Sequence, residues 1–226
     1  MDIPVIAICG IATDEASWLG MPVDRIFVPR GASVDAMAAA ILAELPDRFA
    51  LAGHSMGGYV ALEIAARARD RLAGLALLST TCIADSDEAR AGRQAAIAQA
   101  HTDFAALAER LARAMLSRTS RAKADLLADI RAMLLRCGAD RFAEQQAAAS
   151  IRVEHRGLLA GLTVPVLVLA GDGDAIVAPD RSREMAAALS DVMLHMLPGC
   201  GHVPQREAPE ATRTAISAWR DRLDAR

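Results

Sequence analysis

Aromatic residues are scarce in this chain of 226 residues, at 3%, and no apolar run reaches the roughly 18 residues that a membrane-spanning helix needs. The N-terminus lacks the basic segment and the small-residue cleavage site of a secretory signal peptide. Hydrophobic residues still make up 53% of the chain, in alanine-rich helical patterns and short apolar runs. These features predict a soluble, cytoplasmic protein with no membrane partner.

The chain also lacks a large excess of positive or of negative charge. The formal net charge is -3, and neither sign dominates any long segment, so the sequence offers no basic surface to nucleic acid. Lys123 is the only lysine, and arginine carries almost all of the positive charge. With nucleic acid and membrane excluded, we expect a small molecule as the partner. The sequence does not indicate the oligomeric state.

The four cysteines, Cys9, Cys82, Cys137 and Cys200, are not closely spaced, and no C-x-x-C motif or histidine pair at metal-ligand spacing occurs. Buried thiols are therefore expected in place of disulfides or a structural zinc site. No nicotinamide, flavin or metal-binding signature is present either. We expect a reaction without a cofactor and without a metal.

Six apolar runs are continuous, as expected for strands that are buried on both faces of a parallel sheet. Helical patterns separate most of them, and this alternation predicts an α/β fold with a doubly wound, mostly parallel sheet in a single domain. The predicted strands are residues 3–9, 25–28, 49–52, 75–79, 164–170 and 192–197. The predicted helices are residues 34–43, 58–71, a segment after Pro179, and 209–223.

The segment 84–156 interrupts this alternation. It contains no convincing strand, and its apolar residues recur at helical spacing, so three or four helices inserted between two strands are expected. One interpretation places these helices over the functional site. The other is a helical surface excursion that makes no contact with a substrate.

The pentapeptide Gly53-His54-Ser55-Met56-Gly57 lies between a predicted strand and a predicted helix. A serine in G-x-S-x-G at such a junction is typical of a nucleophile elbow, in which the glycines permit a sharp turn that exposes the hydroxyl. Two later motifs follow strands in the same way. Asp174 comes after the run 164–170, and His202 comes after the run 192–197, which gives the chain order Ser, Asp, His.

In these motifs the chain resembles the α/β-hydrolase superfamily, over nearly its whole length. Cys9-Gly10-Ile11 with Trp18 is similar to the family's His-Gly-x loop and its following tryptophan, although Cys9 stands in place of the usual histidine. The resemblance implies a core of residues 1–83 and 157–226, and a helical cap of residues 84–156. It also implies that the family's first hairpin strands are lacking.

The resemblance assigns a role to each motif. Ser55 becomes the nucleophile, His202 the base that takes its proton, and Asp174 the carboxylate that orients the imidazole. Asp172 follows the same strand, and we expect it to bond backbone amides instead.

Other parts of the site follow from the same resemblance. The backbone N–H groups of Ile11 and Met56 are expected to form the oxyanion hole. Trp18 is expected either to contact the substrate or to lie in the core. The side chain of His54, next to the serine, is expected to point away from the substrate.

The expected function is a serine hydrolase that cleaves a carboxylic ester or a related acyl substrate through an acyl-enzyme. A lactonase, a thioesterase and a C–C bond hydrolase remain open, because they use the same three residues. Two further alternatives are a receptor-like binding protein with slow turnover, and acyl transfer or lyase chemistry on the same site.

Overall fold

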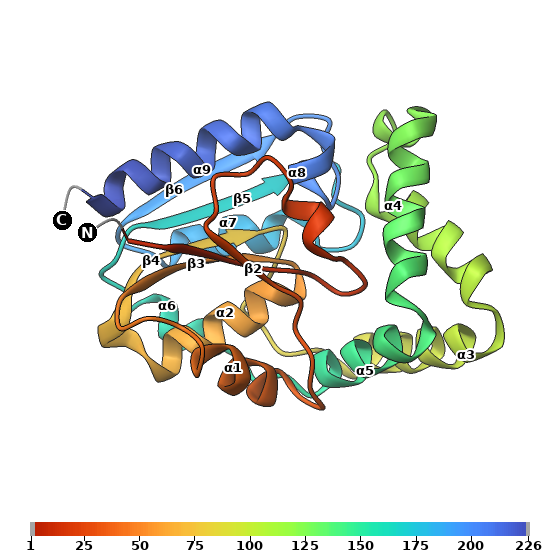
Figure 1. The fold of residues 1–226 in the computed structure, drawn as a ribbon, viewed down its shortest axis with the longest axis horizontal. Coiled ribbons are helices and arrows are strands. Elements are labelled where there is room, and N and C mark those ends of the chain that lie inside the picture. The colour runs from red at the N-terminus through yellow and green to blue at the C-terminus, as the bar shows by residue number, and fades with distance from the viewer. Residues whose placement is uncertain (1–2, 225–226) are drawn as a thin grey trace.

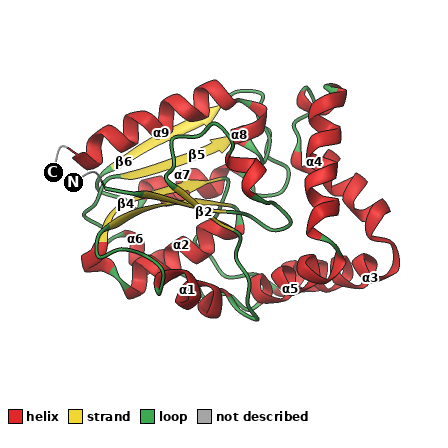
Figure 2. Ribbon diagram, in the orientation of Figure 1, coloured by secondary structure: helices red, strands yellow, loops and turns green. Residues whose placement is uncertain are grey.

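The computed structural model describes residues 3–224. Within this range the chain forms a six-stranded sheet with the order β2-β1-β3-β4-β5-β6, and every neighbouring pair is parallel (Figures 1 and 2). The predicted α/β fold with a mostly parallel sheet is confirmed. The strands are β1 (Val5–Ile8), β2 (Arg25–Phe27), β3 (Phe49–His54), β4 (Leu72–Leu78), β5 (Val166–Gly171) and β6 (Val192–Leu197).

Helices cover both faces of the sheet because successive side chains of a buried strand point to opposite faces. In β3, Phe49 and Leu51 pack in one apolar cluster, whereas Ala50 and Ala52 pack in another. The first cluster is covered by α1 (Val34–Leu42), α2 (Met56–Arg67), α6 (Arg156–Leu159) and α7 (Pro179–Ala187). The second is covered by α9 (Pro209–Asp224), which follows the short helix α8 (Pro204–Glu207).

Several strand and helix boundaries differ from the sequence-based prediction, and those around Ser55 shape the candidate site. Strand β3 continues to His54, because Gly53 and His54 still pair with Leu77 and Leu78 of β4. Helix α2 therefore begins directly after Ser55. It ends at Arg67, and a separate 3-10 helix, η2 (Arg69–Arg71), leads into β4.

The segment between β4 and α6 is helical, as expected. It holds α3 (Asp87–Met115), which is bent at Asp103, then η3 (Ser120–Ala122), α4 (Ala124–Cys137) and α5 (Ala139–Ser150). These helices share an apolar cluster that also includes Ala12 and Val203 from loops of the core. Figure 1 shows the helices beyond the end of the sheet toward which the arrow of β5 points. The division into a cap of residues 84–156 and a core stays a prediction.

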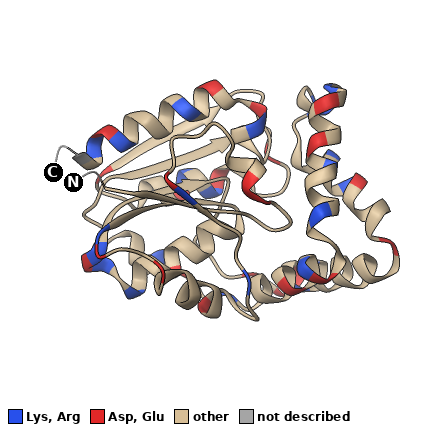
Figure 3. Ribbon diagram, viewed as in Figure 1, with Lys and Arg blue, Asp and Glu red and all other residues tan. Residues whose placement is uncertain are grey.

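Charged residues of both signs are spread along the helices, and the strands of the sheet carry few of them (Figure 3). Within residues 3–224, no helix combines the length and the apolar character needed to cross a bilayer.

Candidate active site

Ser55 occupies the sharp turn between β3 and α2. Its backbone has a φ of 54° and a ψ of -117°, a left-handed conformation that is uncommon for a residue other than glycine. Two contacts hold the turn: the Ser55 amide donates to the carbonyl of Leu78, and the Thr80 hydroxyl donates to the Ser55 carbonyl at 2.7 Å. The neighbouring strand thus fixes the strained backbone and presents the serine at the edge of the sheet.

The two glycines of the G-x-S-x-G motif are required by close backbone contacts. A Cβ atom on Gly53 would lie 2.4 Å from the carbonyl oxygen of Gly57, and one on Gly57 would lie 2.1 Å from that of Ile8. Both contacts are with backbone, which cannot move aside like a flexible side chain. The two glycines therefore allow α2 to pack closely against β3 and β1.

Replacement of Gly57 by alanine is expected to lower the free energy of unfolding by about 3 kcal/mol, because the new methyl group meets the Ile8 carbonyl. Gly92→Ala is the matched control, since a Cβ atom on Gly92, within helix α3, has no neighbouring atom within 4 Å. Urea unfolding measures both. Equal stability of the two variants would contradict this account of the turn.

The structure brings Ser55, His202 and Asp174 together from three loops. His202 Nε2 lies 3.0 Å from Ser55 Oγ, and His202 Nδ1 lies 2.8 Å from Asp174 Oδ2. The loops follow β3, β5 and β6, whose carboxyl ends meet at one edge of the sheet, where open α/β folds bind their ligands. All three side chains are largely buried.

Asp174 is held as a carboxylate. Its Oδ1 atom accepts the backbone N–H groups of Ile176 and Val177, at 2.8 and 3.0 Å. Burial alone would raise the pKa of Asp174, but the charge and hydrogen bond of His202, together with these two amides, hold its pKa below the usual value. Asp172 instead accepts the backbone N–H of Gly199 at 2.7 Å and so joins the two loops.

The backbone around His202 is held by two hydrogen bonds to residues outside its own loop. Its amide donates to the carbonyl of Met115 at 2.7 Å, and His54 donates from Nε2 to the His202 carbonyl, also at 2.7 Å. His54 is fully buried, and burial together with the neighbouring His202 lowers its pKa to about 3, so that it stays neutral. It lies outside the lining of the adjoining cavity and supports the histidine loop.

Glu207 connects the histidine loop to the inserted helices. Its carboxylate accepts the amide of Val203 at 3.2 Å and the amide of Ser117, just after α3, at 2.9 Å. The position of His202 therefore depends on where α3 ends.

The two amides expected to form the oxyanion hole lie on either side of Ser55 in the chain. Met56 is the first residue of α2, and Ile11 lines the cavity that Ser55 faces. Within residues 3–224, no protein acceptor is found for either N–H group. The loop of Ile11 is fixed by the next residue, Ala12, whose amide donates to Gln145 of α5 at 2.8 Å.

Trp18 does not contact the candidate site. The 3-10 helix η1 (Glu15–Trp18) turns its ring into the apolar cluster beneath α9, where it is 1% exposed, and it is absent from the cavity lining. The expectation of a substrate contact is therefore wrong, and its alternative, a core position, is what the fold gives. Cys9 lies in the same cluster, and burial raises the pKa of its thiol to about 12.

A cavity of about 120 Å³ adjoins Ser55 and His202. Half of the residues in its apolar wall come from the inserted helices, namely Leu111, Met115, Leu134 and Phe142, and the other half come from core loops, namely Ile11, Ala12, Ile176 and Val177. Its polar lining also includes Tyr59, Arg93 and Gln146, which the sequence analysis missed. No motif marks these three, because their meeting depends on how the inserted helices pack on α2.

Among the described residues, no candidate metal site is found, since no three histidine, cysteine, aspartate or glutamate side chains lie close enough together to hold one ion.

A comparison with known protein families gives a match over most of the chain. Residues 32–209 match the hydrolase family described as serine aminopeptidase, S33, over more than three quarters of the sequence. The chain belongs to this family. It is a hydrolase family that uses serine, so the predicted enzyme class, a hydrolase of the α/β-hydrolase fold, is confirmed.

Curated relatives and solved structures agree with this family. The chain is 28% identical to a pimeloyl-[acyl-carrier protein] methyl ester esterase of Nitrosospira multiformis over 188 residues, which covers 80% of this chain and 71% of the relative. It is 29% identical over 201 residues to the protein of the same name from Aromatoleum aromaticum, covering 80% and 77% of the two chains.

Among solved structures, a thermophilic esterase from Thermogutta terrifontis, solved with malate bound, is 28% identical and superposes with a TM-score of 0.86 over 99% of this chain and 91% of its own. The enol-lactonase of Burkholderia xenovorans superposes with a TM-score of 0.83 over 97% and 92%, at 22% identity, and so shows the fold alone. Esterase activity of the serine hydrolase type is thus supported by both kinds of comparison.

Proposed function

We propose that this protein hydrolyses a small carboxylic ester through a covalent acyl-enzyme on Ser55. The observation that carries the proposal is the continuous contact from Asp174 through both ring nitrogens of His202 to Ser55 Oγ, beside a cavity with a mainly apolar lining. Serine is a weak nucleophile unless a base takes its proton, and the imidazole lies where it is able to do so.

The proposed reaction has two halves. The proton of Ser55 Oγ moves to His202 Nε2 as Oγ attacks the ester carbonyl, and the carboxylate of Asp174 stabilises the imidazolium that forms. The oxyanion receives hydrogen bonds from the N–H groups of Ile11 and Met56. When the intermediate collapses, the C–O bond breaks and His202 returns its proton to the departing alcohol.

In the second half of the reaction, a water molecule is the nucleophile in place of Ser55. His202 takes a proton from the water molecule as its oxygen attacks the acyl carbonyl, and the acid is released when Ser55 Oγ recovers its proton. Because every proton passes through His202, the account needs no cofactor.

An ester substrate is favoured by the names of the relatives, which are esterases of a methyl ester, whereas the family description names an aminopeptidase. A lactone or thioester is the second candidate, because a serine forms an acyl-enzyme from either bond in the same way. Turnover of methyl esters, thioesters, lactones and aminoacyl amides of matched acyl length tests the choice. Esters are expected to give the highest kcat/KM, and cleavage of the amide alone would contradict the proposal.

A receptor-like protein with slow turnover is distinguished in the same experiment. It would bind the ester tightly and release alcohol at a negligible steady-state rate, whereas the proposed enzyme continues at a measurable steady rate.

We further propose that the inserted helices of residues 84–156 act as a cap that selects the acyl group. Leu134 of α4 lines the cavity, and its neighbour Leu135 is exposed and does not. Leu134→Ala is expected to shift the ratio of kcat/KM for a longer to a shorter acyl chain by about 10-fold toward the longer, because it enlarges the pocket. Leu135→Ala is the control. If Leu134→Ala scales all chain lengths equally, the helices only support the fold.

A further inference from the structure

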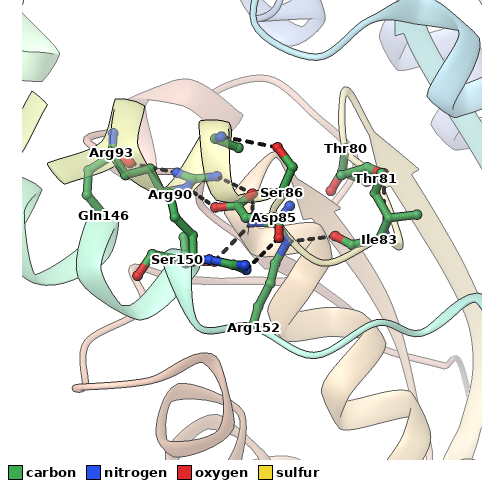
Figure 4. Close-up of polar contacts among 12 residues, drawn as sticks. Thr80, Thr81, Ile83, Asp85, Ser86, Arg90, Arg93, Gln146, Ser150 and Arg152 are labelled. Carbon is green, nitrogen blue, oxygen red and sulfur yellow. Dashed lines mark hydrogen bonds and ion pairs between the residues drawn. The ribbon is translucent and has the colours of Figure 1, made fainter. Parts of the chain in front are cut away.

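Three charged side chains meet where α3 and the chain after α5 approach the core (Figure 4). Arg93 Nε lies 2.5 Å from Asp85 Oδ2, and Arg152 Nη1 lies 2.5 Å from Asp85 Oδ1. Asp85 and Arg152 are almost fully buried, and Arg93 is 18% exposed. One carboxylate thus faces two guanidinium groups, which leaves the cluster with a net positive charge.

Arg93 is the member of this cluster that lines the cavity beside Ser55. A guanidinium carries five N–H donors, and the contacts of Arg93 with Asp85, Gln146 and Tyr59 engage four at most. Burial opposes the charge on Arg93, but the hydrogen bond to Asp85 and the nearness of Tyr59 hold its pKa above the usual value. The side chain therefore stays cationic and keeps a donor for a ligand.

Gln146 adds to this polar part of the cavity. Its Oε1 atom accepts from Arg93 Nη1 at 2.6 Å, which leaves its amide NH₂ group as a further donor. Both residues line the cavity together with Tyr59, which lies one helical turn beyond Ser55 and makes a side-chain hydrogen bond with Arg93.

No carboxylate balances Arg93 from the cavity side. The described residues that line the cavity include no aspartate or glutamate, and most of the others are aliphatic or aromatic. In such poorly hydrated surroundings, an excess positive charge with free N–H donors favours a ligand that carries an anionic oxygen.

We propose that Arg93, with Gln146 and Tyr59, binds a carboxylate on the acyl part of the substrate. The preferred substrates are then monoesters of short dicarboxylic acids, with the ester carbonyl at Ser55 and the free carboxylate at Arg93. This inference rests on the proposed ester hydrolase, and it names the substrate class of the same site.

The test compares pairs of methyl esters that differ only in charge: the monomethyl esters of succinic, glutaric and adipic acids, and the methyl esters of the corresponding half-amides. Proton NMR follows methanol release from both. The quantity compared is the ratio of kcat/KM for the acid to that for its neutral amide, so that any general loss of activity cancels.

For the best chain length, the wild-type ratio is expected to be about 10 or more, and Arg93→Met is expected to lower it by about 10- to 100-fold, the worth of a charge-assisted hydrogen bond. Arg93→Gln, which keeps a donor toward Asp85 but no charge, should lower it in the same way if the methionine variant does not fold. Arg113→Met is the matched control, because Arg113 also lies on α3, pairs with Glu109 and is outside the cavity lining.

A wild-type ratio near one, or an unchanged ratio in both Arg93 variants, would overturn the inference. Arg93 would then have only a structural role, as the ion-pair partner of Asp85. In that case the neutral esters are still hydrolysed, and a fluorophosphonate still labels Ser55. If neither methyl ester is hydrolysed and no label is taken up, the proposed function fails as well, and the inference falls with it.

Discussion

Ser55→Ala is expected to lower kcat for ester hydrolysis by about 10⁶-fold, because the alanine has no oxygen to form the acyl-enzyme and His202 has no proton to take. The loss should not reflect unfolding, since a methyl group replaces a hydroxymethyl group at a position that is 8% exposed. Steady-state hydrolysis of a methyl ester, with the melting temperature measured beside it, gives both quantities.

Ser79→Ala is the matched control for this prediction. Ser79 is also buried, also has a positive φ, and lies at the same edge of the sheet, just after β4. Its hydroxyl has no hydrogen-bond partner among the described residues, so its removal is expected to leave kcat within about 3-fold. Retention of more than about 1% of kcat in Ser55→Ala would place the nucleophile elsewhere.

Asp174→Asn is expected to lower kcat by about 10⁴-fold with the fold intact. The carboxylate beside His202 Nδ1 fixes the tautomer that leaves Nε2 free to accept the serine proton, and an asparagine NH₂ group in its place favours the other tautomer. The amides of Ile176 and Val177 still find an oxygen acceptor in the variant, so the loop is retained.

Asp172→Asn separates catalysis from structure at the same strand end. Asp172 accepts the Gly199 amide and makes no contact with His202, so its replacement is expected to cost about 1 kcal/mol of stability and little kcat. Comparison of kcat and melting temperature for the two variants measures this difference. A larger loss of kcat in Asp172→Asn, at unchanged melting temperature, would reverse the two roles.

The four central strands of the sheet were predictable because they are buried on both faces. Such strands must be continuously apolar, and the run before Ser55 could therefore be found without knowledge of its neighbours. The elbow was predictable for a related reason: a Cβ atom on Gly53 or Gly57 would lie within 3 Å of neighbouring backbone, so the turn requires the glycines of the motif. The loops that bear Asp174 and His202 then follow from the parallel topology.

Contacts that depend on the inserted helices could not be predicted in the same way. Helix α3 carries several arginines in an alanine-rich sequence, and the one that reaches Asp85 and the cavity is set by how α3 packs, which no local pattern encodes. The position of the Trp18 side chain could not be predicted from a local pattern either. Its place in the sequence agreed with a substrate contact, but the turn of η1 directs its ring into the core.

The central claim is that Ser55 becomes covalently acylated, and mass spectrometry of the protein after reaction with a fluorophosphonate tests it most directly. The account predicts one adduct per chain, on the peptide that contains Ser55. It also predicts a rate of labelling that falls sharply in Asp174→Asn, and no label in Ser55→Ala. An adduct that forms undiminished in Ser55→Ala, or that maps to another residue of the wild-type chain, would contradict it.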